Sequence, residues 1–172
     1  DTPPKLIMTG TSAAALGKVK AGCKMQTYYP ITPASDESVY LEEIMAEYGM
    51  NVIQYEDEIA SICGAVGAAV AGVRAATSSS GPGFGLMAEG IGWAAMNEVP
   101  VVIYNYQRGG PATGLPTRHE QGDLLFTINI CHGDLPKIVV APGGMEEYYR
   151  YSFECFNWAD KFQTPVLFLG DK

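Results

Sequence analysis

Short apolar runs alternate along this chain with longer segments in which apolar residues recur at helical spacing. The apolar runs are bounded by Gly, Pro, Ser or Asn, which is typical of β-strands. The run at 99–106 is almost continuously apolar, which indicates a central strand covered on both faces. The pattern predicts seven strands, at residues 5–9, 25–29, 51–54, 73–77, 99–106, 137–140 and 165–169.

The segments between these runs have the apolar spacing and the end signals of helices. They predict six helices, at residues 12–22, 35–47, 56–72, 84–97, 123–130 and 143–160. Strands that alternate with helices from end to end indicate an α/β fold, with a parallel sheet of about six or seven strands and helices on both faces. No repeat or linker divides the chain, so residues 1–172 are expected to form one domain.

The most unusual of these segments is the third helix, which is built almost entirely from small residues. Gly64, Gly67 and Gly72 lie within or at the end of it, and each glycine costs roughly 1 kcal/mol against alanine inside a helix. Retaining three of them indicates that close approach of neighbouring backbone matters more here than helix stability. We therefore expect this helix to be packed closely on several sides.

Three acidic residues, Glu56, Asp57 and Glu58, open this helix. Acidic side chains in a first turn are favoured by the helix dipole, and this is a sufficient explanation for the first two. Glu58 is the last charge before the tightly packed run. Its carboxylate is therefore placed to lie at the mouth of a buried site, where it can exchange a proton with a bound ligand.

Composition and charge exclude several classes of function. The formal net charge of −8 argues against non-specific nucleic-acid binding, which needs clustered Lys and Arg. No apolar run is long enough to cross a membrane, and no secretory signal is recognisable, so a cytoplasmic location is expected. The chain begins with Asp1, which leaves room for a longer parent protein.

Four cysteines are spaced too widely for a metal motif, and none forms a C-x-x-C pair. We expect free buried thiols in a reducing cytosol and no metal site in this chain. These cysteines are Cys23, Cys63, Cys131 and Cys155.

Ligands of parallel α/β sheets bind beyond the carboxyl ends of the strands. The loops that follow strands are therefore the informative ones, and they lie at 29–36, 55–58, 78–83 and 106–123. The loop with the sequence SSGPG at 79–83 could receive an anion at a helix start, or it could be a tight turn that serves packing. It matches neither a dinucleotide-binding glycine motif nor a P-loop.

The loop from Arg108 to Asp123 is longer than most connections in such folds, and loops of this length are usually functional or disordered. Arg108 follows the buried strand directly, so its guanidinium could hold a carboxylate through two parallel hydrogen bonds. The alternative is a solvated loop with exposed charges. His119 and His132 are weak candidates for catalysis, because no G-x-S-x-G motif is present to supply a nucleophile.

Four of these segments together resemble a known family. They are YPITPASD at 29–36, EDEIA at 56–60, TSSSGPGFGLM at 77–87 and QRGGPATGLPTRHEQGDLL at 107–125. They are similar to the alpha subunit of 2-oxoacid:ferredoxin oxidoreductases, with the 2-oxoglutarate type closest. The resemblance covers essentially the whole chain.

The resemblance implies a pyrimidine-binding domain of the thiamine diphosphate-binding fold, within a longer subunit. It implies oxidative decarboxylation of a 2-oxoacid, with 2-oxoglutarate favoured, to acyl-CoA and CO₂, with electrons passed to ferredoxin. Coenzyme A is then a co-substrate. A beta subunit is the expected partner; it would hold the Mg²⁺ and diphosphate of the cofactor and a 4Fe–4S cluster, and the alpha subunit would be active only with it.

The same resemblance assigns roles to individual residues. Glu58 would contact N1′ of the aminopyrimidine and exchange a proton with it. The carboxylate of the 2-oxoacid would be bound by Thr32, Arg108 and Thr117. Further contacts to the cofactor would come from Pro30, Ile31, Ser80, Gly81 and Pro82.

This chain departs from the family pattern in two places. It has Gly10-Thr11-Ser12-Ala13 where members have Gly-Asn-x-Ala, and three serines at 78–80 where many have Thr-Ser before Gly-Pro-Gly. The second departure touches the expected cofactor pocket. Neither removes a residue assigned to catalysis.

Two other functions remain open on the sequence. One is a non-oxidative thiamine diphosphate-dependent decarboxylase or transketolase-like subunit, which would share the glutamate. The other is a non-catalytic assembly domain of the same fold. The identity of the 2-oxoacid, the need for coenzyme A and the roles of Arg118 and His119 are likewise open.

Overall fold

The computed structural model describes residues 5–171. Within them, six parallel strands form one sheet with the order β2-β1-β3-β4-β6-β5. This confirms the predicted α/β class and the parallel sheet. The strands are β1 (Met25–Tyr28), β2 (Asn51–Gln54), β3 (Ala75–Ser79), β4 (Val101–Tyr106), β5 (Ile138–Val140) and β6 (Val166–Gly170).

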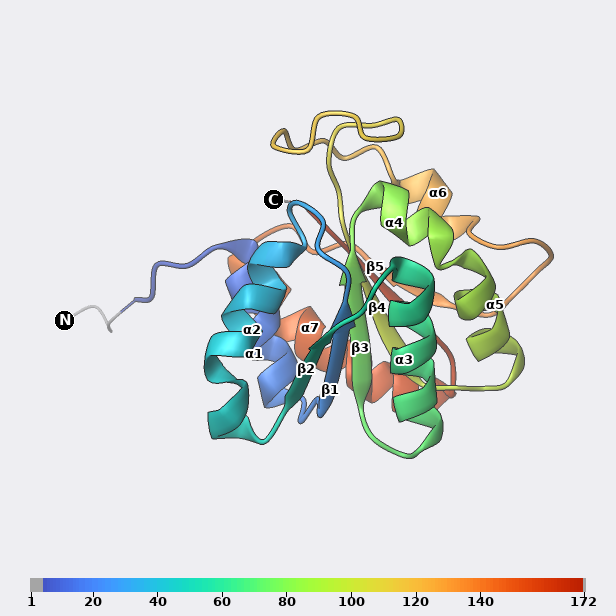
Figure 1. The fold of residues 1–172 in the computed structure, drawn as a ribbon, viewed down its shortest axis with the longest axis horizontal. Helices are drawn as coiled ribbons and strands as arrows, with labels where there is room; N and C mark the ends of the chain where they lie inside the picture. The colour runs from blue at the N-terminus through green and yellow to red at the C-terminus, as the bar shows by residue number, and fades with distance from the viewer. Residues whose placement is uncertain (1–4, 172) are drawn as a thin grey trace.

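Helices cover both faces of the sheet, with α1, α2 and α7 on one side and α3, α4 and α5 on the other (Figure 1). The short α6 lies near α4, at the end of the sheet where the strands finish. The helices are α1 (Gly10–Lys20), α2 (Ser35–Tyr48), α3 (Glu58–Val70), α4 (Gly81–Leu86), α5 (Ala88–Met96), α6 (Leu124–Ile128) and α7 (Met145–Phe162).

The predicted strand at 5–9 is wrong. These residues form no strand, and the side chains of Leu6 and Ile7 are 82% and 102% exposed. The run leads straight into α1, because Thr9 is the N-cap of that helix and its hydroxyl accepts a hydrogen bond from the Ser12 amide at 3.2 Å. The helix therefore begins at Gly10, two residues before the predicted start at residue 12.

The small-residue helix α3 is packed less completely than its composition suggests. A Cβ on Gly64 would lie 2.6 Å from the Tyr55 hydroxyl, so close approach is required there. Nothing in the described chain lies within 4 Å of a Cβ on Gly67, and Ile59 and Val70 are more than half exposed. The expectation of contacts on several sides is thus wrong for residues 5–171, where α3 packs mainly through one face.

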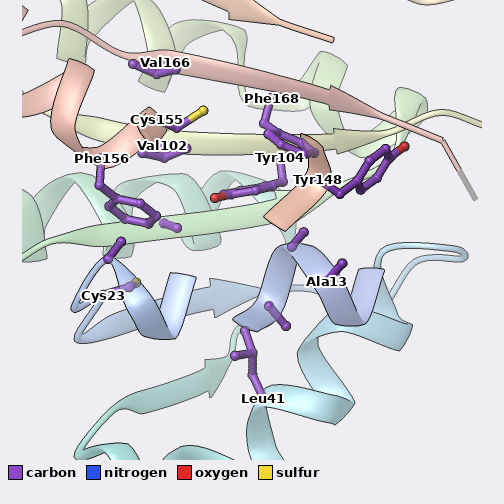
Figure 2. Close-up of a cluster of buried hydrophobic side chains, with 14 of the residues drawn as sticks. Ala13, Cys23, Leu41, Val102, Tyr104, Tyr148, Cys155, Phe156, Val166 and Phe168 are labelled. Carbon is purple, nitrogen blue, oxygen red and sulfur yellow. The ribbon is translucent and has the colours of Figure 1, made fainter. Parts of the chain in front are cut away.

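The core is divided by the sheet into two clusters. Tyr104 and Phe168 project toward α1 and α7, where their ring centroids are 4.8 Å apart (Figure 2). The other cluster joins α3, α4 and α5 to the opposite face of the strands through residues such as Phe84 and Ile103. Strand β4 contributes alternate residues to both clusters, which confirms that it is a central strand.

The cysteines are free, as expected, but they are not all buried. Cys23 and Cys155 are buried, Cys131 is partly buried and Cys63 is exposed on α3. The exposure of Cys63 follows from the one-sided packing of that helix.

Candidate active site

The predicted site residues come from loops that follow strands, and these loops gather at one end of the sheet (Figure 1). Strands β1 and β3 are neighbours in the sheet, yet the chain leaves β1 toward α2 on one face and β3 toward α4 on the other. Such a divergence of neighbouring loops is where α/β sheets bind ligands. The long 107–122 segment projects from the same end.

Glu58 is the first residue of α3, and its side chain is only 7% exposed. The helix starts there because Asp57 is its N-cap, with Oδ1 accepting the Ala60 amide at 2.7 Å. Glu56, just before the cap, is exposed. The three consecutive acids thus take three different positions, and only Glu58 points its charge into the protein at a helix N-terminus, where a negative charge is stabilised.

The carboxylate of Glu58 lies against the start of α4. A Cβ built on Gly83 would collide with both the Glu58 carboxylate and the Ser79 hydroxyl, so only glycine fits there. The SSGPG loop therefore does serve close packing, and the group packed against it is Glu58. The hydroxyl of Ser80 is also buried here and has no hydrogen-bond partner in residues 5–171.

Thr32 and Arg108 meet across the β1 and β4 loops. Arg108 Nη1 donates to the Thr32 carbonyl oxygen at 2.9 Å. The Nε of Arg108 is buried and has no partner in the described part of the chain. One side of the guanidinium is thus fixed by protein, while a buried donor is left that could bind an acceptor such as a carboxylate.

The other predicted residues are less closely gathered. Thr117 is exposed, and the nearest backbone link is the Gly109 amide donating to the Arg118 carbonyl at 3.0 Å, which lays this part of the loop beside the residue after Arg108. Pro30 and Pro82 are exposed, whereas Ile31 and Gly81 are partly buried.

The two histidines lie outside this group. His119 is exposed in the long loop. His132 is 92% exposed, with its Nε2 3.9 Å from a Glu89 carboxylate oxygen. Neither position gives a histidine a described partner suited to proton transfer.

Two polar residues at the base of the long loop escaped the sequence-based prediction. Asp123 accepts a hydrogen bond from Asn105 Nδ2 at 3.1 Å, and its own amide donates to Gln107 Oε1 at 2.9 Å. Asn105 is buried in β4, and its Oδ1 has no partner within residues 5–171. The available signal was a single amide in an otherwise apolar strand, which could have been interpreted as a polar group needed at the strand end.

A buried ion pair behind the site also escaped prediction. Lys18 of α1 and Glu37 of α2 are both fully buried, with Nζ and Oε2 2.7 Å apart. Burial lowers the pKa of Lys18, and the neighbouring Glu37 carboxylate opposes that shift. The helix periodicity placed Lys18 no differently from the exposed Lys20, so only the fold distinguishes them.

The pair is extended by four further side chains. Lys18 Nζ donates to Gln26 Oε1 at 2.8 Å and to the Ser78 hydroxyl at 3.1 Å. The Ser78 hydroxyl also bonds to Glu37, and the Tyr106 hydroxyl donates to Glu37 Oε1 at 2.7 Å. The Lys18 ammonium lies 3.6 Å from the centroid of the Tyr104 ring.

Within residues 5–171, no three His, Cys, Asp or Glu side chains come together in a way that could hold a metal ion. Across the same residues, no helix combines the length and hydropathy that a membrane crossing requires.

Comparison with known proteins gives consistent results. Residues 16–172 match the family model described as pyruvate flavodoxin/ferredoxin oxidoreductase, thiamine diphosphate-binding. The chain is 52% identical to the 2-oxoacid:ferredoxin oxidoreductase 1 alpha subunit of Sulfurisphaera tokodaii, over 96% of this chain and 28% of that protein. It is 45% identical to the 2-oxoglutarate synthase subunit KorA of Archaeoglobus fulgidus, over 96% of this chain and 48% of that protein.

A solved structure shares the fold of this chain. The 2-oxoglutarate:ferredoxin oxidoreductase of Magnetococcus marinus, with 2-oxoglutarate, coenzyme A and succinyl-CoA bound, superposes with a TM-score of 0.94 at 42% identity. The match covers 96% of this chain and 29% of that one. The chain therefore spans between about a quarter and a half of the length of these relatives.

Proposed function

This chain belongs to the pyruvate flavodoxin/ferredoxin oxidoreductase family, in its thiamine diphosphate-binding domain, and from that premise we propose that it forms the pyrimidine-binding part of a 2-oxoacid:ferredoxin oxidoreductase alpha subunit. The observation that carries the proposal is the buried Glu58 carboxylate packed against Gly83, at the same end of the sheet as the Thr32–Arg108 pair. The Glu58 carboxylate suits proton exchange, and the Thr32–Arg108 pair suits carboxylate binding.

The proposed reaction is oxidative decarboxylation of a 2-oxoacid to acyl-CoA and CO₂, with the electrons passed to ferredoxin. We favour 2-oxoglutarate as the substrate, because one relative is named 2-oxoglutarate synthase and the similar solved structure has 2-oxoglutarate bound. When bound, thiamine diphosphate supplies the nucleophilic carbon and the electron sink for the decarboxylation. The protein supplies position, charge and exclusion of water.

The residues present fit the pyrimidine end of this cofactor. Gly83 keeps the space beside the Glu58 carboxylate free of a side chain, and the unpartnered Ser80 hydroxyl is a buried polar group that a ligand could satisfy. In this proposal Glu58 holds and moves a proton at N1′ of the aminopyrimidine. Its burial excludes water from that proton, so the exchange is confined to cofactor and carboxylate.

The 2-oxoacid would be held through its carboxylate by Arg108. The hydrogen bond from Nη1 to the Thr32 carbonyl fixes the plane of the guanidinium, and Nε is left to donate. Thr32 would add its hydroxyl to the same carboxylate, and Thr117 of the long loop would add a third contact. Arg108 recognises what every 2-oxoacid shares, so selectivity among them must come from other contacts.

A beta subunit is the proposed partner, holding the diphosphate, its Mg²⁺ and a 4Fe–4S cluster. The surface it would cover begins at Glu58, because the next residue, Ile59, lines an apolar groove of about 550 Å³ between α3 and α5. Cys63 and Trp93 also line the groove, and Trp93 is 49% exposed. A cofactor whose pyrimidine reaches Glu58 requires its second binding subunit directly beside that residue.

The test is reconstitution of the full-length alpha subunit with its cognate partner, followed by reduction of a viologen dye with a panel of 2-oxoacids. Glu58→Gln is expected to lower kcat by roughly 10²- to 10⁴-fold, the usual value of a positioned proton-transfer group. Glu56→Gln is the matched control, because that acid is exposed next to the same helix and should leave kcat unchanged.

Three results would contradict the proposal. One is a wild-type complex that binds thiamine diphosphate but reduces dye with no 2-oxoacid, which would favour a non-oxidative enzyme. Another is a complex that assembles without binding the cofactor, which would favour an assembly role. The last is equal loss of activity in Glu56→Gln and Glu58→Gln, which would remove the special role of Glu58.

A further inference from the structure

The buried network around Glu37 has no part in the chemistry described above, yet three of its members lie next to a segment that has. Glu37 is in the first turn of α2, which the Thr32 turn leads into. Tyr106 ends β4 just ahead of Arg108, and Ser78 lies in β3 just ahead of Ser80. A single carboxylate therefore contacts the stems of three segments that form the candidate site.

The network is costly to build if stability is its only role. Burying two charges carries a desolvation penalty of several kcal/mol per ion, and replacing such a pair by apolar residues of similar volume is often neutral or stabilising. Lys18 and Glu37 are both fully buried. Their retention is therefore better explained by the geometry that the pair enforces than by the energy it supplies.

That geometry affects Thr32 and Arg108, the two residues proposed to bind the carboxylate of the 2-oxoacid. The position of Thr32 depends on where α2 begins, and the position of Arg108 depends on where β4 ends. The hydrogen bond from the Tyr106 hydroxyl to Glu37 Oε1 joins these two places at 2.7 Å. Lys18 holds the other carboxylate oxygen at 2.7 Å, so Glu37 has no freedom to rotate away from Tyr106.

We propose that Glu37, held by Lys18 and joined to Tyr106, is a positioning residue that sets the separation of Thr32 and Arg108 and thereby the affinity for the 2-oxoacid carboxylate. The proposal rests on the proposed function. It concerns the substrate side of the site and not the cofactor side. Glu58 and Gly83 belong to the opposite face of the sheet, where α3 and α4 pack.

Strand β4 offers a matched pair of variants. Tyr106→Phe removes only the hydroxyl that bonds to Glu37. Tyr104→Phe removes a hydroxyl from a tyrosine that is equally buried on the same face of the same strand, but this one bonds to Ser152 Oγ at 2.7 Å (Figure 2 shows Tyr104). Each variant loses a buried hydroxyl, Tyr106 with its bond to Glu37 and Tyr104 with its bonds to the Ser152 hydroxyl and carbonyl. A purely structural role therefore predicts lower stability and an unchanged KM for both.

The experiment uses the full-length alpha subunit in complex with its partner and measures KM and kcat for the preferred 2-oxoacid, the dependence on thiamine diphosphate concentration, and the unfolding temperature. We expect Tyr106→Phe to raise KM about tenfold, less than the roughly 100-fold that a full ångström of misplacement can cost. Its kcat and its dependence on thiamine diphosphate should stay at wild-type values. Tyr104→Phe should lower the unfolding temperature and leave KM unchanged.

A second variant covers the case in which a single change prevents folding. Lys18→Met combined with Glu37→Leu replaces the ion pair by apolar side chains of similar length and leaves no buried charge unpaired, so it is expected to fold with a smaller loss of stability than either single change. Its KM should nevertheless be raised at least as much as that of Tyr106→Phe, because the join between α2 and β4 is gone. A merely structural network would give a wild-type KM in this double variant.

The outcomes separate the two proposals. If the wild-type complex is active, three results would overturn the positioning role alone. They are an unchanged KM in Tyr106→Phe, an equally raised KM in Tyr104→Phe, and a wild-type KM in the double variant. A wild-type complex that turns over no 2-oxoacid overturns the proposed function, and the positioning role with it.

Discussion

The two faces of this sheet differ in how completely their side chains are enclosed by the covering helices. On the face covered by α1, α2 and α7, even a lysine and a glutamate are fully enclosed and paired. On the face covered by α3, α4 and α5, Ile59 and Trp93 are about half exposed around an apolar groove. We call the first the closed face, because it encloses this ion pair, and the second the open face, because its apolar groove is exposed beside Glu58.

The difference explains how one small domain can be both rigid and incomplete. The closed face fixes the ends of β3 and β4 through Ser78 and Tyr106. The other face offers Glu58 at its upper end, beside the groove. The groups proposed to hold the substrate are thus anchored from the closed side, and the group proposed to act on the cofactor faces the side where a second subunit is expected.

The largest effect should come from breaking the ion pair of the closed face. Lys18→Met leaves the Glu37 carboxylate buried without its counter-charge, which typically destabilises a protein by about 3–5 kcal/mol. Chemical denaturation of the variant measures this loss. Lys20→Met, on the same helix but exposed, should stay within about 0.5 kcal/mol of the wild type. Equal stability of the two variants would show that the closed face is not held by this pair.

Replacing one glycine on each face by alanine should change the stability of the protein in opposite directions. A Cβ on Gly17 of α1 would lie 2.5 Å from the Tyr149 carbonyl oxygen, so Gly17→Ala should cost about 1–3 kcal/mol through forced separation of α1 and α7. Nothing in residues 5–171 approaches a Cβ on Gly67, so Gly67→Ala should stabilise α3 by about 1 kcal/mol. The unfolding temperatures of both variants measure the effects. A destabilised Gly67→Ala would mean that α3 is already enclosed.

A third effect is a dependence of stability on alkaline pH that arises from the closed face. Burial raises the pKa of the Cys23 thiol from 9.0 to about 12, against the opposing influence of Lys18. The unfolded chain releases this proton above pH 9 and the folded chain retains it, so the stabilisation is present below pH 9 and is lost as the pH rises through 12.

Cys23→Ala should therefore reduce the fall in unfolding free energy by at most about 1.4 kcal/mol per pH unit over this range. Denaturation curves collected at a series of pH values measure the slope. Cys63→Ala, at an exposed thiol of the open face, is the control and should retain the wild-type slope. Identical slopes for wild type and Cys23→Ala would show that water reaches Cys23 in the folded state.

The sequence predicted those parts of the fold in which local signals and burial agree. Strand β2 lies where the pattern placed it, and β1 and β5 differ from their predictions by one residue. The strand expected at 5–9 failed because an apolar run does not reveal whether a neighbouring strand is available, and Thr9 instead caps a helix. The helix expected at 84–97 is two helices, α4 and α5, which meet at Met87.

The site was predictable to the extent that its residues lie in recognisable loops. Glu58 and the Thr32–Arg108 pair lie where the loops after strands placed them, although their roles stay predictions. The Glu37 network was not predictable, because its members are far apart in the chain and meet only when α1, α2, β1, β3 and β4 pack together. Nothing in local periodicity distinguishes a lysine that is enclosed from one that is solvated.

The junction at the foot of the long loop has a consequence for how this protein can be altered. Gln107 and Asp123 are hydrogen bonded to each other, so the stems of the loop meet whatever lies between them. Each doubling of a loop's length costs only about 0.6 kcal/mol in closure entropy. The scaffold beneath should therefore tolerate changes in the length of the segment between these two residues, by engineering or by natural drift, whereas Arg108 and Thr117 within it are needed for the proposed substrate binding.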